Sequence, residues 1–246
     1  LSNVLIKKGH KIYPFSRSLG CDISRKESFD AFINKEIKAV FHLAGETFVP
    51  ESWERQEDFY AVNVTGTKNV LDFCLSENAK VIYISGYVYG IPEYLPIDEN
   101  HPVNPNNPYA RSKWQAEELC REYAKDKGLN AVILRPFNIY GEGQDERFLI
   151  PCIIKQIIEK GVIDVRDEIP RRDFIYISDF IEACILLLDY SGDSNLFNIG
   201  FGVSFSVKDI VETIVHCCAK KISWTSLGEK RPNEIPETIA SYKRLN

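Results

Sequence analysis

Three short apolar runs, each followed by a segment long enough to form a helix, limit the fold of this chain more than any other feature. They cover residues 39–43, 81–84 and 131–134. Apolar runs of this length are typical of strands buried on both faces, and strands that alternate with helices favour a parallel sheet. We therefore predict an α/β fold with a doubly wound parallel sheet. Residues 1–143 should form its core, later segments should return to that core, and residues 144–246 should form mainly a smaller lobe.

Helices are expected between these strands and in the C-terminal part of the chain. The helix predicted over residues 59–75 contains Gly66, which costs about 1 kcal/mol in a helix interior, so we expect close packing against a neighbour there. Asn63 in the same helix is interpreted as structural. Pro14 is an unfavourable residue for a central strand. Further helices are predicted over residues 1–8, 25–35, 109–127, 148–160, 178–188 and 206–219, and further strands over 10–15, 162–165 and 174–177.

The segment from Ser85 to Lys113 carries the strongest chemical signal. Ser85 ends the second apolar run, and a helix begins after Asn107, a good N-cap, with Pro108 at the first helical position. Tyr109 and Lys113 then lie four residues apart on one helix face. The ammonium group should lower the pKa of the phenol. Bringing a tyrosine pKa near neutrality takes roughly 3–4 kcal/mol, more than one partly solvated lysine supplies, so a second positive charge is implied.

The spacing of tyrosine and lysine carries little weight by itself. Tyr123 and Lys127 repeat it at the end of the same predicted helix, just before Gly128, where a solvated helix terminus is expected. What distinguishes Tyr109 is its setting, a helix that opens shortly after a hydroxyl residue at the end of a strand. We therefore predict that Tyr109 is catalytic.

Several segments, in this order along the chain, resemble the extended short-chain dehydrogenase/reductase family of nucleotide-sugar epimerases, dehydratases and reductases. They are residues 40–45 (VFHLAG), 63–67 (NVTGT), 85–90 (SGYVYG), 109–113 (YARSK), 134–141 (LRPFNIYG), 172–176 (RDFIY), 198–200 (NIG) and 231–234 (RPNE). The resemblance implies a Rossmann-like core that binds NAD or NADP, and a C-terminal lobe that binds the substrate.

The resemblance also implies a mechanism, which is hydride transfer at a sugar carbon, usually C4. Tyr109 would exchange the proton of the sugar hydroxyl, and Ser85 would hydrogen-bond the reacting oxygen. Lys113 would lower the Tyr109 pKa and hold the nicotinamide ribose, and the oxidised nicotinamide would supply the second positive charge.

The residues expected to bind the coenzyme follow from the same resemblance. Ser16 and Arg17 stand where NAD-dependent members carry an acidic residue, which favours NADP over NAD, although a solvated loop arginine would look the same. Asp22 would contact the adenine amino group or else cap the helix over 25–35. Ala44 and Gly45 are small enough to let the coenzyme approach the backbone. The predicted coenzyme-binding residues are Ser16, Arg17, Asp22, Ile23, Leu43, Ala44, Gly45, Tyr109, Lys113 and Pro136.

The substrate implied by the resemblance is a nucleotide-diphosphate sugar. Asn138 would hydrogen-bond the sugar nucleotide, and Arg231 would bind its diphosphate. Arg172 would lie beside the substrate, or would form a structural ion pair. Ser85 and Tyr87 complete the predicted substrate contacts, Tyr87 as an additional acid or as a wall of the pocket.

Three activities and one non-catalytic role are compatible with this pattern. The family's 4,6-dehydratases carry Asp-Glu where this chain has Gly86 and Tyr87, which disfavours a dehydratase and leaves an epimerase or a ketoreductase. Arg17 and the segment 231–245, which is similar to GDP-4-keto-6-deoxyhexose reductases, favour a reductase. A non-catalytic NAD(P)-binding regulator would be expected to lack the catalytic residues, and all three are present here.

Composition excludes several classes of protein. The net charge of −5 argues against a nucleic-acid surface, and no apolar run has the length of a membrane span or follows a basic leader, so we expect a cytoplasmic protein. The four histidines and seven cysteines lack metal-ligand spacing, so no metal site is predicted.

Two further expectations concern assembly and the chain ends. The helices over 59–75 and 109–127 resemble the family's homodimer interface. The glycine-rich turn that holds the coenzyme pyrophosphate in the family is absent, and the chain contains no methionine, so we expect roughly a dozen or more residues upstream of Leu1.

Overall fold

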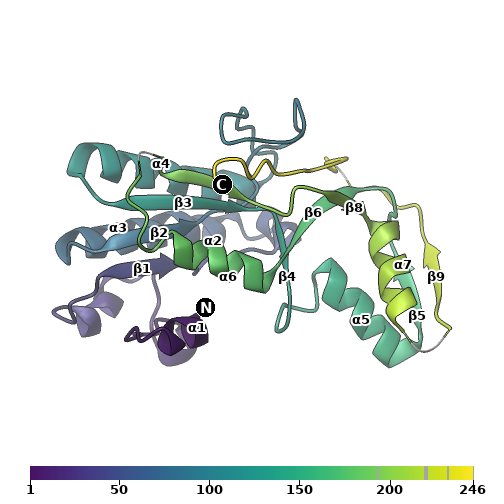
Figure 1. Cartoon of the computed structure of the whole chain (residues 1–246), viewed down its shortest axis with the longest axis horizontal. Coiled ribbons are helices and arrows are strands. Elements are labelled where there is room, and N and C mark those ends of the chain that lie inside the picture. Colours follow the sequence, from purple (N-terminus) through teal and green to yellow (C-terminus); the bar gives the residue numbers. More distant parts are fainter. Residues whose placement is uncertain (193, 219–220, 232, 246) are drawn as a thin grey trace. The chain divides into compact units, whose positions relative to one another are not determined.

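A computed structural model of the chain describes residues 1–192, 194–218, 221–231 and 233–245 (Figure 1). The chain divides into two compact units. The first unit consists of Leu1–Tyr89, Val103–Pro136 and Ile181–Phe197, and the second of Gly90–Pro102, Phe137–Phe180 and Asn198–Asn246.

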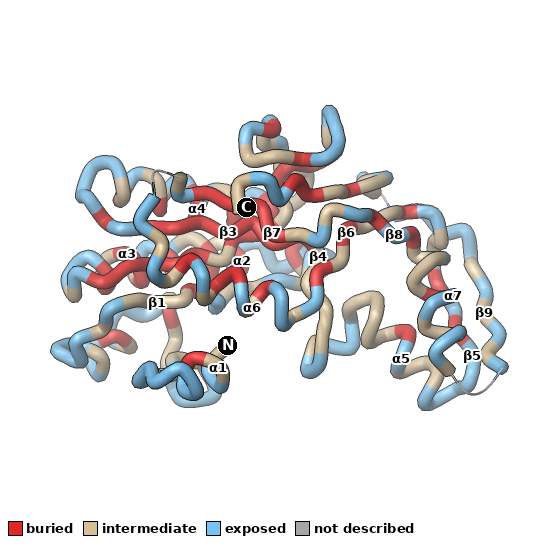
Figure 2. Tube along the Cα trace, viewed as in Figure 1, coloured by how far each residue is buried: buried red, intermediate tan, exposed pale blue. Residues whose placement is uncertain are grey.

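The main sheet contains the three apolar runs that the sequence singles out. Its strands are β1 (Ala39–His42), β2 (Lys80–Ile84), β3 (Ala131–Pro136) and β7 (Leu196–Ile199), in the spatial order β1-β2-β3-β7. The pairs β1/β2 and β2/β3 are parallel, as predicted for an α/β fold. Every residue of β3 and most of β2 are buried, and Figure 2 shows the buried positions following these strands. The absence of alternation in these runs therefore reflects burial on both faces.

The helices of the first unit lie close to their predicted positions. α1 (Ser2–Lys7) precedes Gly9, which has a φ of 88°, and the 3₁₀ turns cover Arg17–Leu19, Lys26–Phe32 and Val49–Trp53. The helix predicted over 59–75 is one continuous run of α2 (Gln56–Tyr60), a π-helical turn (Ala61–Thr65) and α3 (Gly66–Ser76). α4 spans Pro108–Lys127, and α6 (Ile177–Leu186) follows later in the chain.

Gly66 shows the close packing that its position in a helix predicts. A β-carbon at residue 66 would lie 2.7 Å from both Cγ1 and Cδ1 of Ile23. Glycine at this position therefore allows the helix to pack directly against the segment that carries Ile23.

The predicted strand over residues 10–15 is wrong, and the helix predicted over 25–35 is shorter than expected and of the 3₁₀ type. Residues 10–15 have no strand assignment, and the later segment is a 3₁₀ helix, Lys26–Phe32. Pro14 cannot donate a ladder hydrogen bond, and the ring of Phe15 packs against Phe29 and Phe32, with ring centroids 4.8 and 5.4 Å apart. Aromatic packing therefore connects these two segments.

The second unit contains two smaller sheets. β4 (Asn138–Tyr140) is parallel to β6 (Arg171–Tyr176), which is antiparallel to β8 (Ser204–Ser206), and β5 (Val162–Val165) is parallel to β9 (Ser223–Ser226). The strand predicted over 174–177 is the end of β6, which begins at Arg171. α5 (Leu149–Lys160) matches its prediction.

α7 (Val207–Cys217) begins with a reciprocal capping box. The Ser206 hydroxyl accepts from the Asp209 N–H at 3.0 Å, and the Asp209 carboxylate accepts from the Ser206 N–H at 2.8 Å. This confirms the predicted start of the helix, whereas its predicted end at Ala219 lies outside the described residues. None of the helices in the described part of the chain is long and apolar enough to cross a membrane.

Candidate active site

Ser85 and Tyr109 are positioned by two different elements of the first unit. Ser85 directly follows β2, and its N–H donates to the Leu134 carbonyl on β3 at 2.8 Å. On α4 the Asn107 side chain accepts from the Ala110 N–H at 2.8 Å, and Pro108 occupies the first turn, which places Tyr109 at the start of the helix.

The Tyr109 hydroxyl lies directly over Gly86, the residue after Ser85. A β-carbon at residue 86 would collide with the Tyr109 hydroxyl, so only glycine leaves room for the phenol in this position. The Phe59 ring packs edge-on against the Tyr109 ring at a centroid distance of 6.4 Å. The loop that carries Ser85 and the phenol of Tyr109 are therefore in close contact, as the sequence predicts.

The Ser85 hydroxyl is buried and lacks a hydrogen-bond partner among the described residues. A buried polar atom without a partner is costly, and such atoms are rare except where a ligand completes the bonding. The hydroxyl is therefore available to hydrogen-bond a bound molecule.

Lys113 is 4% exposed, and its ammonium group contacts a backbone carbonyl and a tyrosine ring. Its Nζ donates to the Ile84 carbonyl at 2.6 Å and lies 4.6 Å from the centroid of the Tyr83 ring. Burial lowers the pKa of Lys113 to about 8, although the charge of Glu117 partly opposes that shift.

The predicted lowering of the Tyr109 pKa does not occur in the protein alone. Burial raises the pKa of Tyr109 to about 12, so the phenol is protonated at neutral pH. The desolvation of the phenol outweighs any effect of the Lys113 ammonium, which agrees with the expectation that one lysine is insufficient.

The lowered pKa of Lys113 predicts a pH-dependent stability. The unfolded chain keeps its proton up to pH 10.5, whereas the folded chain releases it near pH 8, so the unfolded state binds more protons between these values. The contribution of Lys113 to the free energy of unfolding should therefore rise with pH in this window, by about 3 kcal/mol at most. The buried thiols of Cys74 and Cys184 and the phenol of Tyr109 act in the opposite direction, because burial raises the pKa of each of them to about 12. The test is therefore a difference: between these two pH values, the free energy of unfolding of the wild type, measured by urea denaturation, should rise relative to that of Lys113→Met.

The matched control for this measurement is Lys127→Met, which removes an exposed lysine from the end of the same helix. We expect this variant to keep the wild-type pH dependence. An equal slope in the wild type and in Lys113→Met would contradict the assignment.

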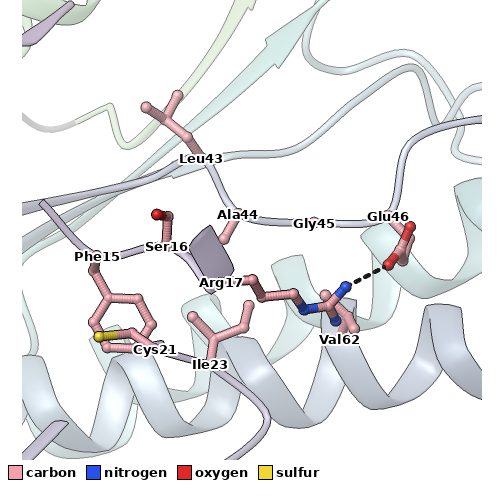
Figure 3. A pocket seen from close by; sticks show the side chains of 10 residues that line it. All are labelled: Phe15, Ser16, Arg17, Cys21, Ile23, Leu43, Ala44, Gly45, Glu46 and Val62. Carbon is pink, nitrogen blue, oxygen red and sulfur yellow. Dashed lines mark hydrogen bonds and ion pairs between the residues drawn. The ribbon is translucent and has the colours of Figure 1, made fainter. Parts of the chain in front are cut away.

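A pocket of about 370 Å³ lies in the first unit beside the end of β1 (Figure 3). It contains six of the predicted coenzyme-binding residues, together with four that the sequence did not suggest. Its lining consists of Phe15, Ser16, Arg17, Cys21, Ile23, Leu43, Ala44, Gly45, Glu46 and Val62. The volume is typical of a site for a small ligand.

Gly45 connects this pocket to the catalytic candidates. A β-carbon at residue 45 would lie 2.9 Å from Oδ1 of Asn63 and 3.7 Å from Nζ of Lys113. A ligand that follows the Ala44–Gly45 backbone would therefore arrive beside Lys113. This arrangement fits a dinucleotide whose reactive end lies next to Lys113 and Tyr109.

Asn63 has the contacts of a structural residue. Its Oδ1 accepts from the Glu46 N–H at 2.9 Å, and its Nδ2 donates to the Glu46 carbonyl at 3.1 Å and to the Ser112 hydroxyl at 2.9 Å. Asn63 thus ties the loop after β1 to α4 and fixes the backbone of Glu46.

Arg17 and Asp22 form an ionic group at the edge of the pocket. The Arg17 side chain extends to Glu46, with Nη1 3.0 Å from Oε1 (Figure 3). Nε of Arg17 lies 3.7 Å from the Asp22 carboxylate. Hydrogen bonds from Ser24 lower the pKa of Asp22 and hold it in a turn ahead of the 3₁₀ segment.

Asp22 and Pro136, which ends β3, are outside the pocket lining. Glu46 lines the pocket but is not among the residues predicted from the sequence. Its position directly after Gly45 is the feature of the sequence that could have indicated it.

The remaining predicted substrate residues occur in both units. Tyr87 belongs to the first unit, where its ring meets the Tyr89 ring edge-on at 5.6 Å. In the second unit, Asn138 donates to the Asp173 carbonyl at 3.1 Å, and Arg231 is exposed. Arg172 forms a short ion pair with Glu234, as in the structural alternative.

Asp173 directly follows Arg172 in the chain. Its carboxylate accepts hydrogen bonds from the N–H groups of Phe201, Gly202 and Ala240 at 2.7, 2.8 and 2.9 Å. Asp173 is buried and connects two backbone segments of the second unit, at residues 201–202 and at Ala240. Its contacts are structural.

The described residues offer neither a metal site nor a disulfide. The described residues contain no group of three or more His, Cys, Asp or Glu side chains that could hold a metal ion. The seven cysteines all lie among the described residues and are free thiols.

Comparison with known proteins identifies the family. The model of the NAD dependent epimerase/dehydratase family matches residues 1–200. A putative UDP-glucose 4-epimerase of Methanocaldococcus jannaschii is 33% identical over 223 residues, which cover 88% of this chain and 72% of that protein. GDP-6-deoxy-D-mannose reductase of Pseudomonas aeruginosa is 33% identical over 187 residues, covering 72% and 62% of the two chains.

A solved structure extends the comparison to the fold. RMD from Pseudomonas aeruginosa, complexed with NADPH, superposes with a TM-score of 0.84 at 27% identity, covering 95% of this chain and 80% of that one. The family model, the relatives and the parallel sheet agree with one another. The chain therefore belongs to the NAD-dependent epimerase/dehydratase family, a branch of the extended short-chain dehydrogenases/reductases.

Proposed function

We propose that this protein oxidises or reduces a nucleotide sugar at C4 with a Ser85, Tyr109 and Lys113 catalytic set. The observation that carries the proposal is the buried Ser85 hydroxyl without a hydrogen-bond partner, next to a glycine over which the Tyr109 hydroxyl lies. A serine hydroxyl and a phenol carried next to each other in this way would suit a sugar oxygen that changes between alcohol and ketone.

The three side chains would have separate roles. Tyr109 would give a proton from its hydroxyl to the sugar oxygen, or take one from it. Ser85 would hydrogen-bond the same oxygen and orient it. The Lys113 ammonium would bind the nicotinamide ribose and stabilise the phenolate form of Tyr109. When bound, NAD(P) supplies the hydride donor or acceptor, and the residues that line the pocket beside β1 would hold it.

The raised pKa of Tyr109 supports a role as proton donor. Because its pKa is about 12 in the protein alone, the phenol carries its proton at neutral pH. It is therefore in the correct form to protonate the oxygen of a ketone that is being reduced.

The first candidate activity is 4-epimerisation of a nucleotide hexose. The similarity to a putative UDP-glucose 4-epimerase over 88% of this chain supports it. The second candidate is a 4-ketoreductase, which Arg17 and the similarity to a GDP-6-deoxy-D-mannose reductase support. Gly86 and Tyr87 stand in place of the acidic pair of 4,6-dehydratases, so a dehydratase is disfavoured.

A panel of UDP- and GDP-sugars, incubated with the purified protein and NAD(P), tests the proposal. Isomerisation of a sugar without net coenzyme turnover would identify an epimerase. Stoichiometric oxidation of NADPH with a 4-keto sugar would identify a reductase. A protein that binds the coenzyme but converts none of these sugars would be the non-catalytic regulator, and the proposal would then be wrong.

We propose that Arg17 and Glu46 together set the choice between NADP and NAD. The ribose phosphate of NADP would have to compete with Glu46 for the Arg17 guanidinium, to which Glu46 is bound at 3.0 Å. Glu46→Gln should therefore raise the affinity for NADP by about fivefold and leave that for NAD within about twofold, since an exposed ion pair is worth up to about 1 kcal/mol. Fluorescence titration with both coenzymes measures this change.

The remaining proposals concern the substrate and assembly. A nucleotide-diphosphate sugar would bind mainly to residues 144–246, and Asn138, Arg172 and Arg231 would contact it. A homodimer would form through residues 59–75 and 109–127. Analytical ultracentrifugation measures the mass in solution, and a monomer at micromolar concentration would contradict the dimer.

A further inference from the structure

A buried ion pair lies behind the catalytic candidates, and the proposed chemistry does not use it directly. Arg135, on β3, donates from Nε to Oε1 of Glu117 at 2.9 Å and from Nη2 to Oε2 at 2.6 Å. The two side chains are 1% and 0% exposed. This bidentate geometry is the strongest form of an arginine-carboxylate contact, and it fixes both partners in orientation.

Glu117 places one end of this pair on the helix that carries the catalytic candidates. It follows Lys113 by four residues and Tyr109 by eight on α4, so the three side chains form one stripe along the helix. Arg121, one turn further, also contacts Glu117 at 3.0 Å. The position of Arg135 is therefore coupled to the helix face of Tyr109 and Lys113.

Tyr89 places the other end on the loop that carries Ser85. Nη1 of Arg135 donates to the Tyr89 hydroxyl at 2.9 Å, and the guanidinium carbon lies 4.8 Å from the centroid of the Tyr89 ring. Tyr89 is fully buried and follows Ser85 by four residues. The loop after β2 is thereby bound to the same guanidinium as α4.

A buried ion pair contributes little net stability, because desolvation of the two charges offsets their attraction. What this ion pair adds is a fixed geometry between two elements. One rigid, planar group bonds to the Tyr109 helix on one edge and to the Ser85 loop on another, while the adjacent Leu134 carbonyl accepts the Ser85 N–H. A small displacement of reacting groups is known to cost large factors in rate.

We propose that Arg135, Glu117 and Tyr89 form a positioning group that fixes the Ser85 hydroxyl relative to the Tyr109 hydroxyl. The inference rests on the proposed function, because it assigns the group a role in the reaction of those two hydroxyls. The residues act through Ser85 and Tyr109 and are not themselves in contact with the reacting atoms.

Tyr89→Phe tests the inference with the smallest change, since it removes one hydroxyl and leaves the ion pair in place. We expect kcat to fall about tenfold with an unchanged KM, because the catalytic geometry changes and the binding residues do not. We also expect faster hydrogen exchange of the backbone amides of residues 86–90 in the protein without ligands. This second measurement needs no activity and separates failure of the inference from failure of the proposed function.

Tyr123→Phe is the matched control, because the Tyr123 hydroxyl is likewise bonded to a side chain, the Asp72 carboxylate at 2.6 Å. It should lower the melting temperature about as much as Tyr89→Phe and leave kcat and exchange in residues 86–90 unchanged. Arg135→Lys keeps the positive charge but loses the planar guanidinium that bonds to both Glu117 and Tyr89, and it should lower kcat at least as far as Tyr89→Phe. The inference is overturned if Tyr89→Phe matches Tyr123→Phe in both kcat and hydrogen exchange.

Discussion

Tyr109→Phe is expected to lower kcat by about a thousandfold and to leave the affinity for the coenzyme within about twofold. The substitution removes only the hydroxyl that lies over Gly86, and the ring can keep its edge-on contact with Phe59. The sugar oxygen would then lose the group that the proposed mechanism assigns to its proton transfer. Steady-state kinetics and a coenzyme titration measure the two quantities on the same preparation.

The chain supplies its own control for Tyr109→Phe. Tyr123 lies on the same helix with a lysine four residues later, and its hydroxyl donates to Asp72. Tyr123→Phe should therefore lower the free energy of unfolding by about 1 kcal/mol and leave kcat unchanged. Equal activity in Tyr109→Phe and the wild type would rule out the assigned role.

Ser85→Ala should have the second largest effect on activity with almost no effect on stability. The hydroxyl is buried without a partner among the described residues, so its removal breaks no hydrogen bond and should leave the free energy of unfolding unchanged or slightly raised. The reacting oxygen would lose one hydrogen bond in the transition state, so kcat should fall by about a hundredfold or more. Urea denaturation measures the free energy of unfolding, and steady-state kinetics measure the fall in kcat.

Ser112→Ala is the matched control for stability. The Ser112 hydroxyl is also buried, but it accepts from Asn63 at 2.9 Å and donates to the Tyr109 carbonyl at 2.8 Å. Its removal should cost about 1–3 kcal/mol, because a buried amide group loses its partner. A Ser85→Ala variant that is destabilised as strongly as Ser112→Ala and keeps full activity would show that Ser85 is structural.

The sequence predicts the first unit well where local signals and burial agree. The runs that become β2 and β3 are buried on both faces, the run that becomes β1 is partly buried, and α4 has an N-cap, a first-turn proline and Gly128 at its end with a φ of 69°. The strand predicted over residues 10–15 is wrong because a strand needs a neighbouring strand to pair with, and a local sequence pattern does not show whether one is present. Their place in the structure depends on the packing of Phe15 against two distant rings.

The candidate site shows the same division between local and tertiary information. Ser85, Tyr109 and Lys113 are recognisable from their setting, but the raised pKa of Tyr109 is not, because it comes from burial by surrounding residues. Arg135 and Glu117 are 18 residues apart, and only the fold brings them together. Likewise, the sequence leaves open whether Arg172 faces a substrate, and its ion pair with Glu234 becomes visible only in the structure.

The most direct test of the central claim is an experimental structure of the protein with NAD(P)⁺ and a nucleotide sugar bound. Our account predicts that the Tyr109 and Ser85 hydroxyl oxygens both lie within about 3.2 Å of one oxygen of the sugar. Lys113 should lie beside the nicotinamide ribose in the same structure. A sugar bound with its oxygens out of reach of these two hydroxyls, while the coenzyme occupies the pocket beside β1, would contradict the account.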